Sequence, residues 1–371
     1  MNNELEEKTG RLVEMMAREK LAGVLLNAQH NFAWLTGGGF NGIDTSRENG
    51  AATLLVAQDG RGFILANNIE MQRMLSEQVN PADFEPIEFS WLDEKACDDI
   101  IYRKASEVLG SADIAADVLV SSHIRPVEKL IAACRYSLTE AEADRFRRLG
   151  SDAGKAMRSV IALIQPGESE IEIAAKMRSE LLRDGMDSVV TLVAADDRIK
   201  KFRHPVPTDN RWQKTLMMVT CAKRHGLIAS LTRMVCVGDA PSELLKRTEA
   251  AARINARIYS ATSPEAVGSD LFKVLADAYA ATGFANEINL HHQGGAAGYR
   301  TRDWTAHPRS SEIVQPNQAF AWNPSITGTK VEETCIVAAN GVEVITASPD
   351  FPQISTVIDG KEYLSPGILV I

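Results

Sequence analysis

"NLHHQGGAAGYRTRDWTAHP", residues 289–308, places two adjacent histidines before a Gly-Gly-Ala-Ala-Gly run, followed by an arginine, an aspartate and a third histidine. Histidines can bind a metal, and glycines can surround a phosphate or turn the chain, because glycine permits both tight turns and close backbone packing. Which of these applies depends on the residues that the rest of the chain supplies.

The composition is that of an ordinary globular protein with room for two domains. The chain has 371 residues, of which 45% are hydrophobic and 24% charged. A net charge of -9 argues against a nucleic-acid partner, because phosphate binding requires an excess of lysine and arginine. No secretory signal is visible, and no apolar run approaches the roughly 20 residues of a membrane span. The five cysteines are dispersed along the chain, a pattern that is typical of reduced thiols rather than of disulfides. We therefore expect a cytoplasmic protein that binds neither nucleic acid nor membrane.

The first part of the chain alternates helix and strand patterns. Apolar residues at helical spacing predict a helix over residues 4–21, a short strand follows at 22–28, and residues 51–67 are typical of a hairpin. Residues 69–134 continue the alternation. Alternating elements of this kind indicate an α/β domain, which we place at residues 1–137.

A second domain begins with a helix-start signal. Thr139 followed by Glu142 matches a capping box. The elements expected after this first helix are a second helix from about residue 170, strands at 188–195 and 214–222, helices near 241–260 and 268–282, and C-terminal strands with a hairpin turn at Asn340-Gly341. Helices bunched between antiparallel strands indicate an α+β domain at residues 138–371.

Polar residues of the kinds used in catalysis gather in a few stretches of the second domain. His204 stands before a proline in KKFRHPVPTDNRW, and Glu332 and Glu333 follow WNPSITGTKV. Taken alone, a histidine before proline is typical of a loop, and a Glu-Glu pair at a strand end is typical of a solvated face. The order and spacing of these stretches favour a functional interpretation.

In that order, the segments resemble the pita-bread family of methionine aminopeptidase, aminopeptidase P, prolidase and creatinase. SLTEAEADRFRRLGSDAGKAM and IQPGESEIEIAAKM match the start of the family's catalytic domain, and RHP matches its active-site histidine. The other matching segments are CAKRHGLIASLTRMVCVGDAP, HHQGGAAGY, GTKVEETCIV and, in the first domain, AGVLLNAQHNFAWLTG. The resemblance implies a creatinase-type N-terminal α/β domain at 1–137, followed by a pita-bread domain at 138–371. It also implies a homodimer.

The metal ligands are where the chain departs from this family, whose metallopeptidases hold two divalent ions with two aspartates, one histidine and two glutamates. The corresponding positions are Val219, Ser230, Gly295, Asn323 and Glu332, and of these Glu332 alone keeps a carboxylate. A hard dication needs several anionic oxygens or imidazoles in place of its water. We therefore expect neither a metal nor another cofactor at this site.

Creatinase is, within this resemblance, a precedent for catalysis without metal, since it cleaves a C–N bond with a histidine and two carboxylates. His204 and Glu332 match two of these groups, whereas the third position is Thr232. The expected catalytic residues are therefore His204, as general acid or base, and Glu332, as the carboxylate that sets its pKa. Cys221 is expected to be a core residue.

Arg302 corresponds to a second catalytic histidine of prolidase-like relatives, so the resemblance implies a guanidinium in the pocket. A guanidinium binds a carboxylate through two parallel hydrogen bonds, which favours a small carboxylate-bearing or dipeptide substrate. An internal ion pair with Asp303 or Glu332 is the alternative for Arg302. The expected substrate-binding residues are Arg302, Thr232, Asn323 and His292.

Two functions remain open. The first is a metal-independent hydrolase of the Xaa-Pro aminopeptidase or creatinase type, acting on an amide or other C–N bond. The second is a pseudoenzyme that binds a peptide, metabolite or partner protein in the same pocket, favoured by the loss of most metal ligands. A metal-dependent aminopeptidase is a third choice and would need ligands such as His291, His292 or His307. Otherwise His291 and His292 are expected to be strand residues.

Overall fold

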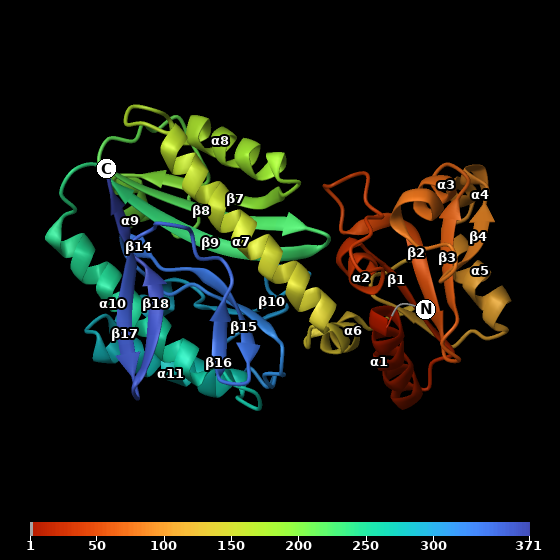
Figure 1. Cartoon of the computed structure of the whole chain (residues 1–371). Coiled ribbons are helices and arrows are strands. Elements are labelled where there is room, and N and C mark those ends of the chain that lie inside the picture. The colour runs from red at the N-terminus through yellow and green to blue at the C-terminus, as the bar shows by residue number, and fades with distance from the viewer. Residues whose placement is uncertain (1–2) are drawn as a thin grey trace. The chain divides into compact units, whose positions relative to one another are not determined.

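The computed structural model describes residues 3–371 and divides the chain into two compact units, the first ending at Tyr136 and the second running from Ser137 to Ile371 (Figure 1). Within these described residues, no helix combines the length and the low polarity that crossing a membrane requires.

The N-terminal unit is built on a mixed six-stranded sheet with the order β4-β3-β2-β1-β5-β6. β2 and β3 form the predicted antiparallel hairpin, and β1 pairs antiparallel with β2 and parallel with β5. Every residue of β1 is buried, so both faces of the sheet are covered at its centre, as in α/β proteins. The strands are β1 (Gly23–Ala28), β2 (Asn49–Ala57), β3 (Gly62–Asn67), β4 (Glu85–Phe89), β5 (Ile114–Ala116) and β6 (Arg125–Pro126).

Helices of the same unit follow the predicted alternation, with one addition. The sequence did not predict α2, which is only seven residues long and buried along most of its length. It therefore lacks the polar stripe by which amphipathic helices are recognised. The helical elements are α1 (Asn3–Glu19), α2 (Gln29–Leu35), α3 (Met71–Arg73) continued by the π-helical turn η1 (Met74–Gln78), α4 (Trp91–Ala96), α5 (Ile100–Leu109) and α6 (Glu128–Arg135).

The C-terminal unit begins with two helices that pack along a four-stranded sheet of order β19-β9-β8-β7 (Figure 1). Thr139 caps the first helix through the predicted capping box with Glu142, and Ser169 caps the second in the same way with Glu172. The helices are α7 (Glu140–Leu163) and α8 (Glu170–Arg183), and the strands are β7 (Asp187–Ala195), β8 (Thr215–Arg224), β9 (Leu227–Cys236) and β19 (Ile368–Val370).

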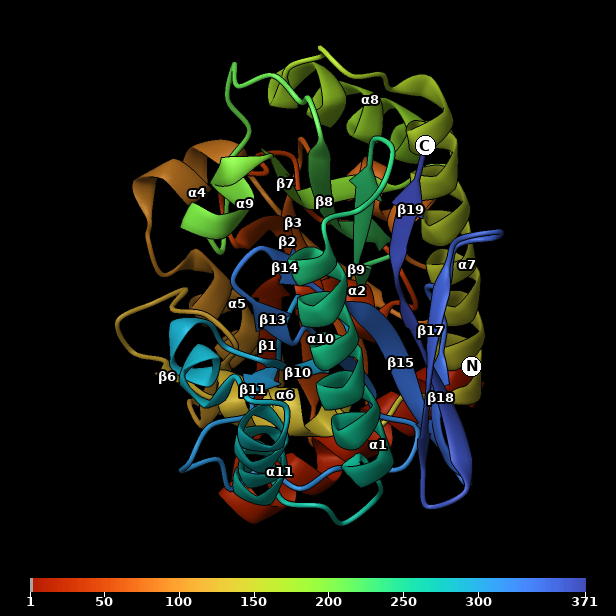
Figure 2. The ribbon, with the colours of Figure 1, turned by 90° about the vertical axis from the view of Figure 1, so that its left-hand side faces the viewer.

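A second sheet of this unit, with the order β11-β10-β12-β15-β16, carries the glycine-rich stretch in β10. Helix α10 packs against α11 and against the β17–β18 hairpin (Figure 2). The remaining elements are α9 (Asp197–Lys201), α10 (Ser242–Ala261), α11 (Gly268–Ala281), the 3₁₀ helix η2 (Ala285–Leu290), β10 (Gly294–Ala297), β11 (Trp304–Thr305), β12 (Ala319–Trp322), β13 (Ser325–Ile326), β14 (Thr329–Lys330), β15 (Glu333–Ala338), β16 (Gly341–Val344), β17 (Gln353–Ile358) and β18 (Lys361–Pro366).

The C-terminal hairpin differs from the prediction by one residue. Ala338 pairs with Gly341 across β15 and β16, so the turn residues are Ala339 and Asn340 rather than Asn340 and Gly341. Gly341 opens β16 with a φ of 116°, a conformation that glycine adopts without steric cost. The β17–β18 hairpin and β19 were also not predicted.

Candidate active site

The candidate residues of the second unit converge on one small cavity, although they come from segments far apart in the sequence. Its volume is about 200 Å³, below the roughly 300 Å³ at which pockets for drug-sized ligands begin. Thr232 lies behind the lining, hydrogen-bonded to Glu332. The lining consists of His204, His292, Arg302, Asn323 and Glu332, together with Val190, Leu192, Val219, Cys221, Thr301 and Lys330.

The antiparallel pair β8–β9 places several of these side chains. Val219 lies opposite Thr232, and Cys221 lies opposite Ser230. Because side chains two residues apart on a strand share a face, Val219 and Cys221 both reach the cavity. The Thr232 hydroxyl donates a hydrogen bond of 2.7 Å to Oε2 of Glu332. This bond fixes the carboxylate on the cavity side.

Glu333 is directed into a separate buried network. Its carboxylate lies 2.9 Å from the guanidinium of Arg233 and accepts a hydrogen bond from Thr346. Burial raises the pKa of Glu333 to about 7 in spite of Arg233. Glu332 and Glu333 are therefore not the solvated pair that the motif alone would suggest, since they are 2% and 1% exposed. Sequence position alone does not reveal that the start of β15 is buried.

Glu332 is buried between two cations. Nη2 of Arg302 lies 3.2 Å from Oε1, and Nζ of Lys330 lies 3.6 Å from Oε2. Burial by itself raises the pKa of Glu332, but Lys330, Arg302 and the hydrogen bonds from Thr232 and Arg302 more than reverse this, so that the pKa is lowered. The carboxylate is therefore ionised at neutral pH, and two cations against one anion leave the cavity with excess positive charge.

Arg302 thus makes one of the internal ion pairs considered for it, with Glu332 as the partner. It also donates to the Thr301 carbonyl at 2.5 Å. Within residues 3–371, however, its buried Nε has no hydrogen-bond partner. The guanidinium therefore holds Glu332 and leaves one N–H donor unpaired among the described residues.

His204 stands in the loop that follows α9, where its neighbour Arg203 anchors the backbone. Arg203 pairs with Glu287 of η2 and donates to Oγ1 of Thr327 at 2.9 Å. Glu287 in turn accepts hydrogen bonds from the backbone and hydroxyl of Thr327, each at 3.0 Å. These contacts tie the His204 loop to the segment that leads into His291.

The pKa of His204 is lowered below its usual range. Burial is the largest cause and the positive charge of Lys330 the second, while Glu332 raises the pKa and Arg302 lowers it. Glu332 therefore acts in the expected direction, but it does not dominate. The ring is neutral at pH 7 and can accept a proton.

His291 and His292 lie between η2 and β10 rather than on a strand, so the strand prediction is wrong. The side chain of Gln293 returns to the carbonyl of His291, and β10 begins only after this bend. Nε2 of His291 lies 3.0 Å from Nε2 of His204. Burial lowers the pKa of His291 to about 2 and that of His292 to about 4. His307 is exposed and does not join this group.

The positions that the resemblance assigns to metal ligands do not fit a dinuclear metal centre. Val219 is apolar, and the Ser230 hydroxyl is directed to a neighbouring thiol. A Cβ atom on Gly295 would lie 2.1 Å from the carbonyl oxygen of Trp304, so β11 fills the space that a histidine needs. Glu332 is already held by two cations. One engaged carboxylate does not replace the hydration of two hard dications.

Lys330 is the residue of the cavity that sequence reasoning missed. It is 4% exposed and contacts Glu332. Its position only two residues before Glu332 in the sequence was the available signal. Cys221 is buried as expected but also lines the cavity, and burial and then Glu332 raise the pKa of its thiol. It is therefore protonated and a poor nucleophile.

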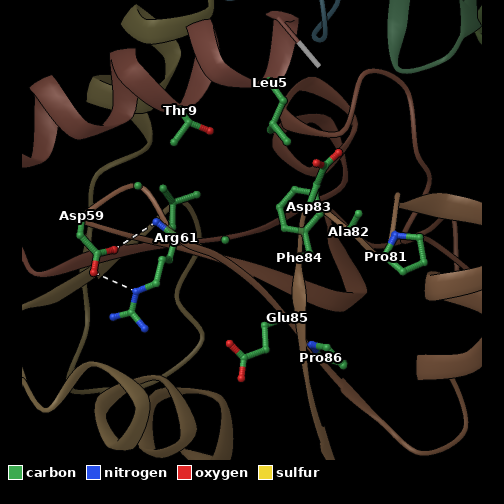
Figure 3. Close-up of a pocket in the computed structure, with 13 residues that line it drawn as sticks. Leu5, Thr9, Asp59, Arg61, Pro81, Ala82, Asp83, Phe84, Glu85 and Pro86 are labelled. Atoms are coloured by element: carbon green, nitrogen blue, oxygen red, sulfur yellow. Dashed lines mark hydrogen bonds and ion pairs between the residues drawn. The ribbon is translucent and has the colours of Figure 1, made fainter. Parts of the chain in front are cut away.

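A larger cavity lies in the N-terminal unit, lined by residues of α1, of the β2–β3 turn and of β4 (Figure 3). Its volume is about 580 Å³. Asp59 and Arg61 pair with one another there at 2.8 Å, and both side chains are more than half exposed. By volume alone, this cavity would be the preferred candidate for the active site. The smaller one gathers buried ionisable groups with shifted pKa values, which are the stronger indicator of chemistry.

Comparison with known proteins connects this cavity to a family. Residues 144–343 match the family described as metallopeptidase family M24, and residues 8–147 match the creatinase/prolidase N-terminal domain. A Xaa-Pro dipeptidase of Pyrococcus horikoshii is 22% identical over 365 residues, which cover 92% of this chain and 97% of that protein. The uncharacterized peptidase YqhT of Bacillus subtilis is 22% identical over 257 residues, 67% of this chain and 72% of YqhT.

Solved structures show the same fold. A Xaa-Pro dipeptidase from Bacillus anthracis superimposes with a TM-score of 0.79 at 19% identity, covering 99% of this chain and 100% of that one. The X-Pro aminopeptidase of Thermotoga maritima gives a TM-score of 0.74 at 16% identity, over 98% and 99% of the two chains. These matches confirm the predicted architecture, an N-terminal α/β domain of the creatinase type followed by a pita-bread domain.

Proposed function

Because the chain belongs to metallopeptidase family M24, we propose that it hydrolyses an amide or other C–N bond in a small carboxylate-bearing molecule. Xaa-Pro dipeptides are the first candidate substrates, since two of the similar proteins carry the name Xaa-Pro dipeptidase. The observation that carries the proposal is the convergence of His204, Arg302, Lys330 and Glu332 on one cavity of about 200 Å³.

The reaction is proposed to run without the dinuclear metal centre of this family. The chemistry of the ligand positions supports this, because an apolar side chain, a hydroxyl, a glycine and an amide stand where anionic or imidazole ligands are needed. The group that activates the attacking water must then be a side chain of the cavity.

His204 is the residue suited to proton transfer. Its lowered pKa keeps the ring neutral at pH 7, so it can take a proton from the water whose oxygen attacks the carbonyl carbon. It returns that proton to the leaving nitrogen as the C–N bond breaks. A positioned acid–base group of this kind typically contributes 10²- to 10⁴-fold in rate. The positive charge that Lys330 adds to the cavity favours the oxyanion over the neutral amide.

The substrate is held by groups that keep unused hydrogen-bonding capacity. Nε of Arg302 is a buried donor and Oδ1 of Asn323 a buried acceptor, and within residues 3–371 neither has a partner. The first suits a carboxylate of the substrate and the second an amide or ammonium N–H. Thr232 contributes by holding Glu332, and His292 lines the cavity.

The proposal is tested by a thermal-shift screen of Xaa-Pro dipeptides, small amides and guanidino acids, followed by chromatographic assay of the hydrolysis products. A ligand at a hundredfold excess over its Kd stabilises the protein by about 2.7 kcal/mol, or roughly 5–11 °C at 2–4 °C per kcal/mol. We expect His204→Ala to lose turnover by 10²-fold or more while it keeps ligand binding. The matched control is His307→Ala, because that histidine is exposed and outside the cavity. Turnover by His204→Ala at the wild-type rate would contradict the catalytic assignment.

A binding function without catalysis is the second candidate. It is favoured by the substituted ligand positions and by the raised pKa of Cys221, which leaves the cavity without a thiolate nucleophile. In that case a ligand from the screen stabilises the protein but is recovered intact, and His204→Ala changes its affinity rather than a rate.

A further inference from the structure

Three imidazole rings meet at the edge of the cavity, whose lining includes His204 and His292. The ligand-capable nitrogens of His204, His291 and His292 all lie within 4.8 Å of one another, and Nε2 of His204 is 3.0 Å from Nε2 of His291. The rings of His291 and His292 stack with their centroids 4.4 Å apart. The buried Nδ1 of His291 has no hydrogen-bond partner among the described residues.

The protein holds the two segments that carry these rings in fixed positions. Gln293 is 1% exposed and accepts a hydrogen bond from Tyr279 of α11, while its backbone carbonyl accepts one from the Asn323 amide at 3.0 Å. On the other side, Arg203 binds Glu287 and so ties the His204 loop to η2. Supporting contacts of this kind orient the ligands of metal sites.

We propose that His204, His291 and His292 form a mononuclear binding site for a late first-row divalent cation such as zinc, nickel or copper. Imidazole nitrogen is a preferred ligand of these ions. With bonds of about 2.1 Å, tetrahedral ligand nitrogens lie roughly 3.4 Å apart. The nitrogens lie at most 4.8 Å apart, so the largest gap has to close by no more than about 1.4 Å, which rotation of the exposed His292 side chain can supply.

The type of ligand, rather than the surrounding charge, makes this site selective. Lys330 and Arg302 face the same cavity, and Glu332 offsets only one of them. Hard cations such as Mg²⁺, Ca²⁺ and Mn²⁺ depend on anionic oxygen ligands, which this cluster does not offer. They are therefore excluded, whereas ions that form strong bonds to neutral imidazole are admitted. The ligand set also differs entirely from the dinuclear positions of the family.

Metal binding has a consequence for the proposed function, although the site does not depend on it. A ring nitrogen that coordinates a metal has no lone pair left to accept a proton. Occupation of the cluster and proton transfer at the same nitrogen of His204 therefore exclude each other. If the chain is a hydrolase as proposed, the fraction of hydrolytic activity that zinc abolishes should equal the fraction of His204–His291–His292 sites that zinc occupies in the binding measurement.

The test is equilibrium dialysis of the full chain, stripped with EDTA, against micromolar Zn²⁺, Ni²⁺ or Cu²⁺, followed by elemental analysis. We expect one equivalent of each ion and none of Mg²⁺ or Mn²⁺. Altering a supporting residue of a metal site costs about 10- to 100-fold in affinity, so loss of a ligand in His291→Ala or His292→Ala should cost at least tenfold. His307→Ala, which alters an exposed histidine outside the cluster, should bind as the wild type does.

Three results would overturn the proposal. They are binding of less than half an equivalent at 100-fold excess of zinc, unchanged affinity in His292→Ala, and two equivalents of metal that are lost in Glu332→Gln. Because His292 is exposed, its alanine variant is expected to fold even where His291→Ala does not. Binding is read by metal content and not by turnover, so the absence of a hydrolysed substrate leaves the result intact.

Discussion

Replacing Glu332 with glutamine should destabilise the C-terminal unit strongly while keeping the shape of the side chain. In the native protein the carboxylate faces Arg302 at 3.2 Å and Lys330 at 3.6 Å, and the residue is 2% exposed. The amide leaves both cations buried without their counter-charge. Removing one partner of a buried ion pair typically costs about 3–5 kcal/mol. At 2–4 °C per kcal/mol, the Tm should fall by roughly 6–20 °C.

The loss should depend on pH in a defined direction. Because the native pKa of Glu332 is lowered, its stabilisation is complete above the unfolded-state pKa of about 4.3 and disappears as the pH falls through the native pKa. The difference in Tm between wild type and Glu332→Gln should therefore be full at pH 7 and shrink below about pH 4. Since Glu332 also raises the pKa of His204, any pH–rate profile should shift to lower pH in the variant.

Thermal unfolding followed by circular dichroism between pH 3 and 8 measures both effects. The matched control is Glu343→Gln, which removes a carboxylate from an ion pair with Arg147 whose side chains are 42% and 38% exposed. Exposed pairs of this kind contribute at most about 1 kcal/mol. The reasoning is refuted if the Tm falls by the same amount in the two variants, or if the decrease in Tm of Glu332→Gln does not change with pH.

The remaining predictions concern the cavity and the assembly. Arg302→Lys keeps the charge but loses the planar fork, so the Kd of a carboxylate ligand, measured by calorimetry, should rise while the Tm changes less than in Glu332→Gln. Thr232→Val removes the hydroxyl that donates to Glu332 and should cost about 1.5–3 kcal/mol in chemical denaturation; an unchanged midpoint would contradict this. Gly295→Ala places a methyl group 2.1 Å from the carbonyl oxygen of Trp304 and should cost at least about 1–3 kcal/mol of overpacking, measured in the same way. Light scattering should give a mass of twice 40.5 kDa if the chain is the homodimer that the resemblance implies, and a monomer mass would count against it.

The secondary structure was predictable from the sequence where short-range rules decide it. The helix after Thr139 begins as predicted, because a capping box involves only residues within one helical turn. Predictions failed where a contact with a residue distant in the sequence decides the local conformation. His291 and His292 were expected on a strand, but the Gln293 side chain, held by Tyr279 of α11, bends the chain before β10. The β19 strand exists because it pairs with β9, and the residues of β19 alone do not predict this pairing.

The sequence by itself determined the order of the domains and the short set of polar residues worth considering, because these follow from residue identity and spacing. Only the tertiary structure decided what those residues can do. It brought Arg302 beside Glu332 and His204 beside His291, and it filled the space at Gly295 with a neighbouring strand. The direction of each pKa shift was also decided there, because burial and charges brought near by folding set the free energy of ionisation. Residue identity offers an imidazole or a carboxylate, and its surroundings determine whether it is charged, paired or free to bind.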